Sequence, residues 1–141
     1  MTPEERAYIR YRLARAREAL DEARLLLEAD HLATAVTRIY YACFYAVSAL
    51  LFSEGLSSTK HSGVRALFDQ HWVKPGRISK ELGRFYRDMF ERRQESDYAD
   101  LVSYDPKEVS GWLAQARTFV EEISRQVEHK LKEEDQYDKQ P

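Results

Sequence analysis

The chain has 141 residues, of which 43% are hydrophobic and 33% are charged, and its formal net charge is −2. This length allows a single domain with a hydrophobic core, and the composition is typical of a soluble helical protein. The balanced charge excludes a protein that is basic over its whole surface and attracts nucleic acid through net charge alone.

The first predicted helix covers residues 3–29. Thr2 and Glu5 match a capping box, and Pro3 suits the first helical position. Apolar residues then follow at steps of four and three, which places them in one narrow stripe on one face. This stripe consists of Ile9, Leu13, Ala16, Leu20, Ala23 and Leu27.

The second predicted helix, residues 32–54, carries two rows of residues at helical spacing. Its length is close to that of a membrane span, but Arg38 lies inside it, and a charge there is costly; we therefore expect a buried central helix and no membrane contact. A helix with more apolar surface than one face can bury also predicts a two-fold homodimer. The first row contains Leu32, Val36, Ile39, Cys43, Val47 and Leu50, and the second contains Thr34, Arg38, Tyr41, Tyr45 and Ser48.

Three further helices are predicted, over residues 59–73, from residue 79 to a frayed end at 93–98, and over residues 105–131. Short connections between long amphipathic helices predict antiparallel neighbours. The expected fold is therefore all-α, an up-and-down bundle of four long helices and one short helix. We expect one domain over residues 1–133 and a charged, disordered tail over residues 134–141.

The segment Arg92-Arg93-Gln94-Glu95-Ser96-Asp97-Tyr98 is the most informative part of the chain. Two guanidiniums, two carboxylates and a phenol within seven residues are more polar chemistry than helix packing needs. The planar guanidinium of arginine can form bidentate hydrogen bonds to a phosphate. Arg92 and Arg93 are therefore candidate binders of a nucleotide or RNA. The alternative is a cationic helix end that the helix macrodipole favours.

Arg38 needs a partner, because an unpaired buried cation is costly. One interpretation is a structural ion pair with Asp97 or another carboxylate. The other is a polar cleft that Arg38 shares with Arg93, Asp97 and Tyr98. Tyr41 joins Arg38 as a candidate binding residue, although tyrosines in such a helix are more often core or dimer contacts.

Metal and cofactor chemistry finds no support in the sequence. The single cysteine, Cys43, excludes a cysteine-based metal site and favours a reducing, cytoplasmic setting. The four histidines have no metal-ligand spacing, and no glycine-rich phosphate loop occurs. We therefore predict no protein metal site and no cofactor. The histidines are His31, His61, His71 and His129.

Three segments together resemble the HEPN domain family, over about residues 4–126. They are the run from Arg38 to Ala46, the run from Lys60 to Val64, and the run from Arg93 to Tyr98. The chain is most similar to the small stand-alone prokaryotic members. This resemblance implies a helical-bundle homodimer, often the partner of a minimal nucleotidyltransferase in a toxin–antitoxin pair. Active members are metal-independent ribonucleases in which an Arg holds the phosphate and a His, after four to six intervening residues, transfers a proton.

The sequence departs from this pattern at the histidine. The positions allowed by the spacing from Arg93 hold Tyr98, Ala99 and Asp100, and a tyrosine is a poor general base at neutral pH. One hypothesis is a dimeric module that binds a nucleotidyltransferase partner, a nucleotide or RNA with weak or no cleavage. The alternative is a ribonuclease toxin that uses Arg93 with Asp97 or Tyr98 as catalytic residues. A third is a purely structural bundle in which these groups form surface ion pairs.

Overall fold

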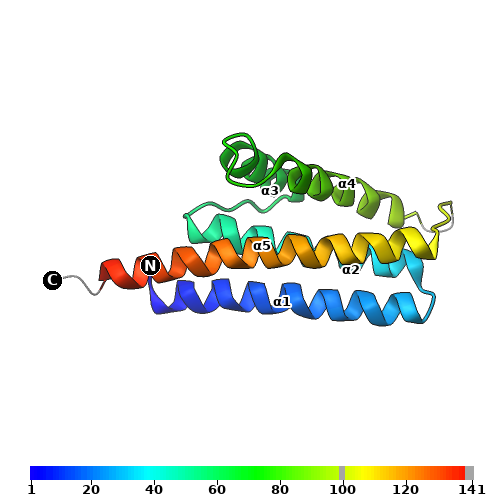
Figure 1. The fold of residues 1–141 in the computed structure, drawn as a ribbon, viewed down its shortest axis with the longest axis horizontal. Helices are drawn as coiled ribbons and strands as arrows, with labels where there is room; N and C mark the ends of the chain where they lie inside the picture. Colours follow the sequence, from blue (N-terminus) through cyan, green and yellow to red (C-terminus); the bar gives the residue numbers. More distant parts are fainter. Residues whose placement is uncertain (99–100, 139–141) are drawn as a thin grey trace.

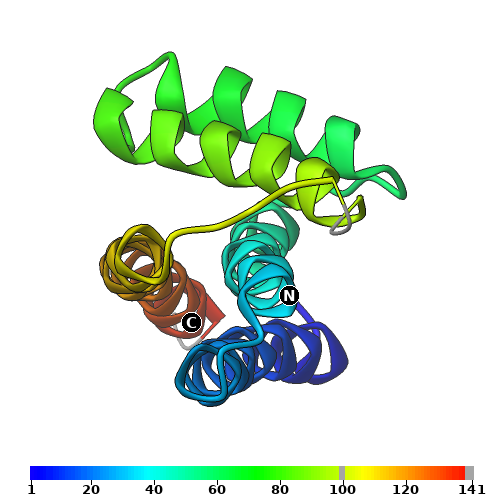
Figure 2. The ribbon, with the colours of Figure 1, turned by 90° about the vertical axis from the view of Figure 1, so that its right-hand side faces the viewer.

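The computed structural model describes residues 1–98 and 101–138, and it confirms the predicted all-α fold. Three long helices, α1, α2 and α5, pack against one another as a three-helix bundle, and α3 and α4 lie together across one side of it (Figures 1 and 2). α1 and α4 run in one direction and α2 and α5 in the other, as in an up-and-down bundle (Figure 1). The elements are α1 (Pro3–Glu28), α2 (Leu32–Ser53), α3 (His61–Phe68), the π-helical turn η1 (Asp69–Val73), α4 (Lys80–Ser96) and α5 (Pro106–Asp138).

The predicted capping box starts α1. The Thr2 side chain accepts a hydrogen bond from the Glu5 N–H at 3.0 Å, and the Thr2 N–H donates to Glu5 Oε1 at 2.9 Å. These bonds satisfy backbone donors that the first turn of a helix leaves free. The predicted apolar stripe faces the core, where Ile9, Leu13 and Ala16 are fully or almost fully buried.

α2 is the central helix, and its two rows have different surroundings. The first row is buried from Val36 to Leu50. The second row is only half-buried at Arg38, Tyr41 and Tyr45. By length and composition α2 could cross a membrane, with a mean hydropathy of 1.4, but 61% of the apolar window is buried, as in the core helix of a bundle.

The third predicted helix differs from the structure in its start and in its regularity. It begins at His61 instead of Thr59, because the Ser58 hydroxyl accepts a hydrogen bond from the Lys60 N–H at 3.2 Å and holds the preceding turn. After Phe68 the α-helix changes to the π-helical turn η1. The chain then turns at Gly76, which has a φ of +82°, before α4 begins.

The predicted end of the last helix near Leu131 is wrong, because α5 continues to Asp138. Within α5, Lys130 pairs with Glu134 at 3.6 Å, one helical turn away. Arg6 of α1 also reaches Asp135 at 3.0 Å, which ties the extra turns to the three-helix bundle. Residues 134–138, predicted to be a disordered tail, are therefore helical, and residues 139–141 lie outside the described residues.

Candidate functional site

The last turn of α4 is fixed against α2, and this contact positions Arg93. The Ser96 hydroxyl donates to the Arg93 carbonyl at 2.7 Å and lies 2.8 Å from the Thr37 hydroxyl of α2. Ser96 is 7% exposed. The predicted fraying at 93–98 therefore begins only after Ser96, where α4 ends.

The Arg93 guanidinium lies against two tyrosines of α2. One terminal nitrogen donates to the Tyr41 hydroxyl at 3.4 Å, and Cζ lies 5.8 Å from the ring centres of both Tyr40 and Tyr41. Asp97 approaches Arg93 Nε at 3.9 Å, which is a loose ion pair between partly exposed side chains. The guanidinium thus keeps hydrogen-bonding capacity for an anionic ligand.

His61, the first residue of α3, packs against the same two tyrosines. Its Nδ1 lies 2.7 Å from the Tyr40 hydroxyl, and its ring stacks on Phe44 with centroids 4.2 Å apart and planes inclined by 7°. The His61 ring centre also lies 5.7 Å from the ring centres of Tyr40 and Tyr41. The fold therefore brings an imidazole to the Arg93 site that the local spacing in the sequence does not supply.

Burial lowers the pKa of His61 below its ordinary value of 6.5, and the positive charge of Arg93 lowers this pKa further. The imidazole is therefore neutral at neutral pH and can accept a proton. Burial also raises the pKa of Tyr40 far above 10.0, so its hydroxyl stays protonated beside Nδ1. When Nδ1 donates to the Tyr40 oxygen, Nε2 is the acceptor, and no described residue bonds to it.

Arg38 and Tyr41 extend the site along α2. The Arg38 Cζ lies 4.9 Å from the Tyr41 ring centre, on which Arg93 also packs. Arg38 pairs with Glu22 of α1 at 3.7 Å, so its carboxylate partner is Glu22 and not Asp97. Arg38 therefore has a structural partner, and through Tyr41 it also lies next to the Arg93 site.

Two other candidates lie apart from this group. The Arg92 Cζ stacks on Trp112 of α5 at 4.1 Å from the ring centre, directed away from Tyr41. Tyr98 is 67% exposed, and its hydroxyl makes no hydrogen bond within the described part of the chain. The family spacing would also allow a histidine at positions 99 and 100, and these two residues lie outside the described residues. The structure therefore groups Arg38, Tyr41, Arg93 and Asp97 with His61.

His61 is the residue that reasoning from the sequence missed. Its signal was present, because the run from Lys60 to Val64 is one of the segments that resemble the HEPN domain. This position in the run favours Gly63, since a Cβ there would overlap the Ser58 hydroxyl and lie 2.9 Å from Ser58 Cβ, so that Ser58 would have to move. The close approach of Gly63 to Ser58 fixes the turn that carries His61.

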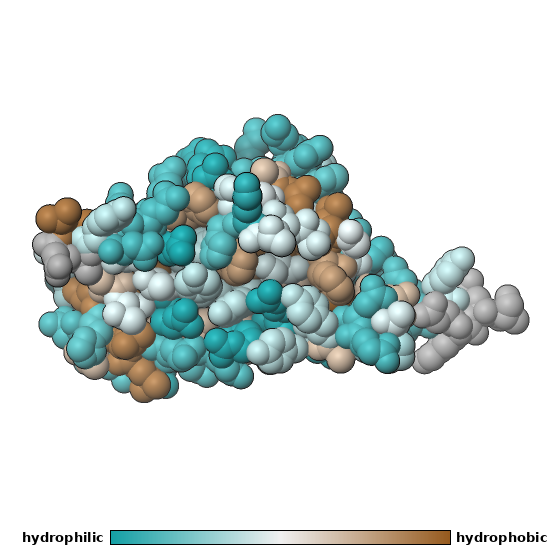
Figure 3. Space-filling view, turned by 180° about the vertical axis from the view of Figure 1, so that it is seen from behind, coloured by the Kyte–Doolittle hydropathy of each residue, from teal (hydrophilic) through white to brown (hydrophobic). Residues whose placement is uncertain are grey.

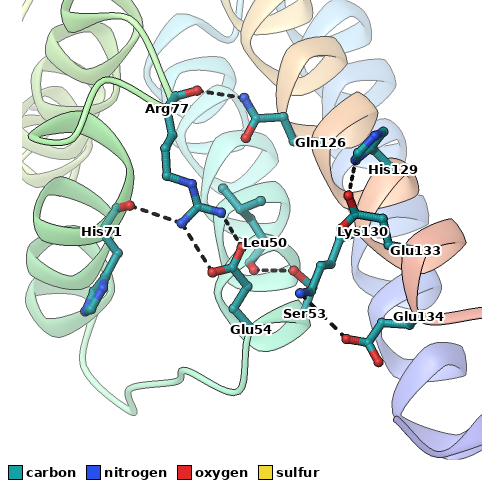
Figure 4. Close-up of polar contacts among 10 residues, drawn as sticks. All are labelled: Leu50, Ser53, Glu54, His71, Arg77, Gln126, His129, Lys130, Glu133 and Glu134. Atoms are coloured by element: carbon teal, nitrogen blue, oxygen red, sulfur yellow. Dashed lines mark hydrogen bonds and ion pairs between the residues drawn. The ribbon is translucent and has the colours of Figure 1, made fainter. Parts of the chain in front are cut away.

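A second polar cluster lies at the C-terminal end of α2 (Figure 4). Arg77 forks onto both carboxylate oxygens of Glu54, donates to the His71 carbonyl at 3.2 Å and stacks on Trp72 at 4.6 Å. Gln126 of α5 donates to the Arg77 carbonyl at 2.9 Å. These contacts join the turn before α4 to α2 and α5, so this cluster has a structural role.

Comparison with known proteins identifies the family. The family model of the HEPN domain matches residues 9–127. A UPF0332 protein of Thermotoga maritima is 49% identical over 125 residues, which cover 89% of this chain and 95% of that protein. A protein of Methanocaldococcus jannaschii named "Putative toxin MJ0605" is 31% identical over 82% of this chain and 86% of its own length. The chain belongs to the HEPN family.

Proposed function

We propose that this protein is a toxin-like HEPN module that cleaves RNA without a metal ion, with Arg93 and His61 as its catalytic residues. The observation that carries this proposal is the packing of both side chains against Tyr40 and Tyr41. His61 supplies the proton-transfer group that the spacing after Arg93 lacks. The two relatives from M. jannaschii whose names contain the word toxin support the toxin-like role.

In this mechanism the ribose 2′-hydroxyl attacks the adjacent phosphorus. His61 Nε2 takes the hydroxyl proton, and Arg93 stabilises the negative charge that develops on the phosphate oxygens. The bond from phosphorus to the 5′-oxygen breaks, and that oxygen leaves with the proton that the protonated His61 returns. The products are a 2′,3′-cyclic phosphate and a free 5′-hydroxyl.

We further propose that the protein forms a homodimer. The match to the HEPN family supports such an assembly, because small stand-alone members of this family are usually homodimers. We further propose a cytoplasmic setting and a minimal nucleotidyltransferase as the partner that controls the toxin. Sedimentation that finds only monomers at micromolar concentration would contradict the dimer.

RNA cleavage by the purified protein in excess chelator tests the proposed chemistry. Loss of the general base in His61→Asn is expected to lower the rate by about 10²- to 10⁴-fold. Arg93→Ala should also remove cleavage, whereas Tyr98→Phe should retain it, because Tyr98 lies apart from the site. Cleavage that survives in His61→Asn, or that requires a metal, would refute the mechanism.

A second candidate is a binding module without cleavage, for which the contacts of Arg93 give one specific argument. Asp97 and the Tyr41 hydroxyl already engage the guanidinium. If Asp97 and Tyr41 keep these contacts when RNA binds, Arg93 can bind a phosphate. It is then not free to move and stabilise the negative charge that develops during cleavage. RNA binding that depends on Arg93, with no cleavage of any tested RNA, would favour this candidate.

A further inference from the structure

Arginine and tyrosine side chains form a row along the seam between α1 and α2, beginning at the Arg93 site. Arg38 lies over Tyr41, and the ring centres of Tyr41 and Tyr45 are 5.8 Å apart. Arg12 and Arg15 of α1 both face Tyr45, with Cζ 5.5 Å and 5.3 Å from its ring centre. Arg12 also lies 5.3 Å from the ring centre of Tyr8, which ends the row. We call this row the arginine–tyrosine strip: Arg38, Tyr41, Tyr45, Arg15, Arg12 and Tyr8.

The arginines of the strip differ in how their charge is compensated. Arg15 pairs with Glu18 at 2.5 Å and Arg38 pairs with Glu22 at 3.7 Å. Within the described part of the chain, Arg12 has no carboxylate partner, and its Nε donates to the Tyr8 hydroxyl at 2.9 Å. The terminal nitrogens of Arg12 therefore remain available to an anionic group.

The surface around the strip suits a polar ligand with flat rings. A small pocket adjoins Arg12 and Tyr8, and it is also lined by Phe44 and by the hydroxyl residues Ser48 and Ser57. Figure 3 views the molecule from the side on which α2 lies, and pale and teal residues predominate there while brown residues occur in small separate groups. This surface lacks the continuous apolar patch of a protein-docking face.

We propose that the arginine–tyrosine strip binds a single-stranded RNA segment adjacent to the phosphodiester at Arg93 and His61. This inference rests on the proposed function, which supplies RNA as the substrate. Cationic groups that follow the phosphate backbone, interleaved with rings on which bases stack, are the usual means of binding a single strand. The α2 part of the strip spans about 10 Å from Arg38 to Tyr45, at 1.5 Å per residue. RNA that extends beyond the reacting phosphodiester therefore gains contacts.

The charge of the strip argues against a second copy of this chain as its occupant. A two-fold interface centred on the strip would bring the arginines of one copy close to the arginines of the other, because both copies contribute the same strip. Like charges that face each other across an interface cost binding free energy. A phosphate backbone instead supplies the negative charge that Arg12 lacks.

The test is fluorescence anisotropy with a single-stranded oligoribonucleotide of about eight nucleotides. Its riboses carry 2′-O-methyl groups, so it cannot be cleaved through the 2′-hydroxyl. Arg12→Gln is expected to weaken binding by about tenfold and to reduce the slope of log K against log salt concentration by about 0.7. Tyr8→Leu, which keeps an apolar side chain against Phe52, should weaken binding by a similar factor.

Arg10→Gln is the matched control, because Arg10 lies on the same helix but pairs with Glu128 of α5 at 3.1 Å. It removes the same charge from a different face and should leave the affinity unchanged. Equal weakening in Arg10→Gln and Arg12→Gln would overturn the proposal. So would unchanged RNA binding in Arg12→Gln with altered sedimentation, which would assign the strip to contact between copies.

The proposed function can fail separately from this inference. If unmodified RNA is not cleaved but the Arg12→Gln effect is observed, the strip binds RNA and the cleavage mechanism is wrong. If cleavage depends on His61 but affinity does not depend on Arg12 or Tyr8, the mechanism stands and the strip is not an RNA site.

Discussion

The two polar clusters of this protein use similar side chains in different ways. In each, an arginine packs on aromatic rings, Arg77 on Trp72 and Arg93 on Tyr40 and Tyr41. Arg77 forks onto Glu54 and also reaches a carbonyl, so its charge and donors are used within the fold. Arg93 has one loose carboxylate contact, at 3.9 Å.

The histidines of the two regions differ in the same way. In the Arg77 region, His129 of α5 lies 3.4 Å from the carboxylate of Glu133. His61 instead faces Arg93, which favours the neutral form. The Arg77 cluster thus has balanced charges, whereas the Arg93 cluster combines a loosely paired cation with a neutral imidazole, which is the combination that the proposed cleavage requires.

The largest effect that tests this comparison is expected from Gly63→Ala. A Cβ at this position would overlap the Ser58 hydroxyl, so the turn that carries His61 must shift. A displacement of a catalytic group by about 1 Å can cost about 10²-fold in rate, and we expect a loss of that order in RNA cleavage. The structure of the Arg77 cluster should be unaffected.

Two further variants separate the position of His61 from a general effect on the helices. Gly111→Ala adds the same methyl group to α5, where nothing lies within 4 Å, and it should preserve cleavage and raise stability by about 1 kcal/mol. Ser58→Gly combined with Gly63→Ala removes the overlap and should restore much of the rate. A rate that stays low in this double variant would contradict the steric explanation.

The Arg77 cluster should respond in stability and not in activity. Glu54→Gln removes the carboxylate partner of Arg77, whose side chain is 42% exposed. Because solvent screens such a pair, we expect a loss of about 1 kcal/mol in the free energy of unfolding, measured in urea. RNA cleavage per folded molecule should be unchanged.

Glu28→Gln is a matched control for this prediction. It removes a carboxylate from the more exposed pair of Arg24 and Glu28, which lies within α1. Because this pair joins no separate elements, its loss should cost about 0.3 kcal/mol. Equal losses in the two variants would show that Arg77 and Glu54 do not hold the turn before α4 to the bundle.

Local sequence patterns predict the elements of this fold better than they predict its site. The capping box of Thr2 and Glu5, the buried stripe of α1 and the central place of α2 follow from spacing within one helix. The length of α5 does not follow from such spacing, because Asp135 forms an ion pair with Arg6 from the other end of the chain. Tertiary contacts of this kind have no signature in a local window.

The candidate site shows the same limit of prediction from local sequence patterns. Arg93 is evident from the polar segment that surrounds it, and Asp97 follows one turn later. His61 lies more than thirty residues earlier in the chain, and it meets Arg93 only because α3 packs beside α4 on α2 (Figure 2). Searching for a histidine at a fixed spacing from Arg93 therefore leads to Tyr98, which the structure leaves in solvent.

The smallest and most direct test of the comparison is the titration of His61, followed by NMR. The midpoint should lie below 6.5, because burial and Arg93 both lower the pKa. Arg93→Gln should raise it toward the ordinary value, whereas Arg92→Gln should leave it unchanged, because Arg92 stacks on Trp112. A midpoint at or above 6.5, or an equal response to both variants, would contradict the proximity of Arg93 and His61.

The same shift predicts how stability depends on pH. A histidine whose pKa is lower in the folded state binds more protons when the chain unfolds, so unfolding becomes more favourable as the pH falls. The contribution of neutral His61 is fully present above about pH 6.5 and is lost as the pH falls below that value toward the folded pKa. Urea unfolding of the wild type and of His61→Asn should therefore converge in stability as the pH falls from 7.5 to 5.5. Arg93→Gln should reduce this convergence, because without the nearby cation the folded and unfolded pKa values of His61 lie closer together.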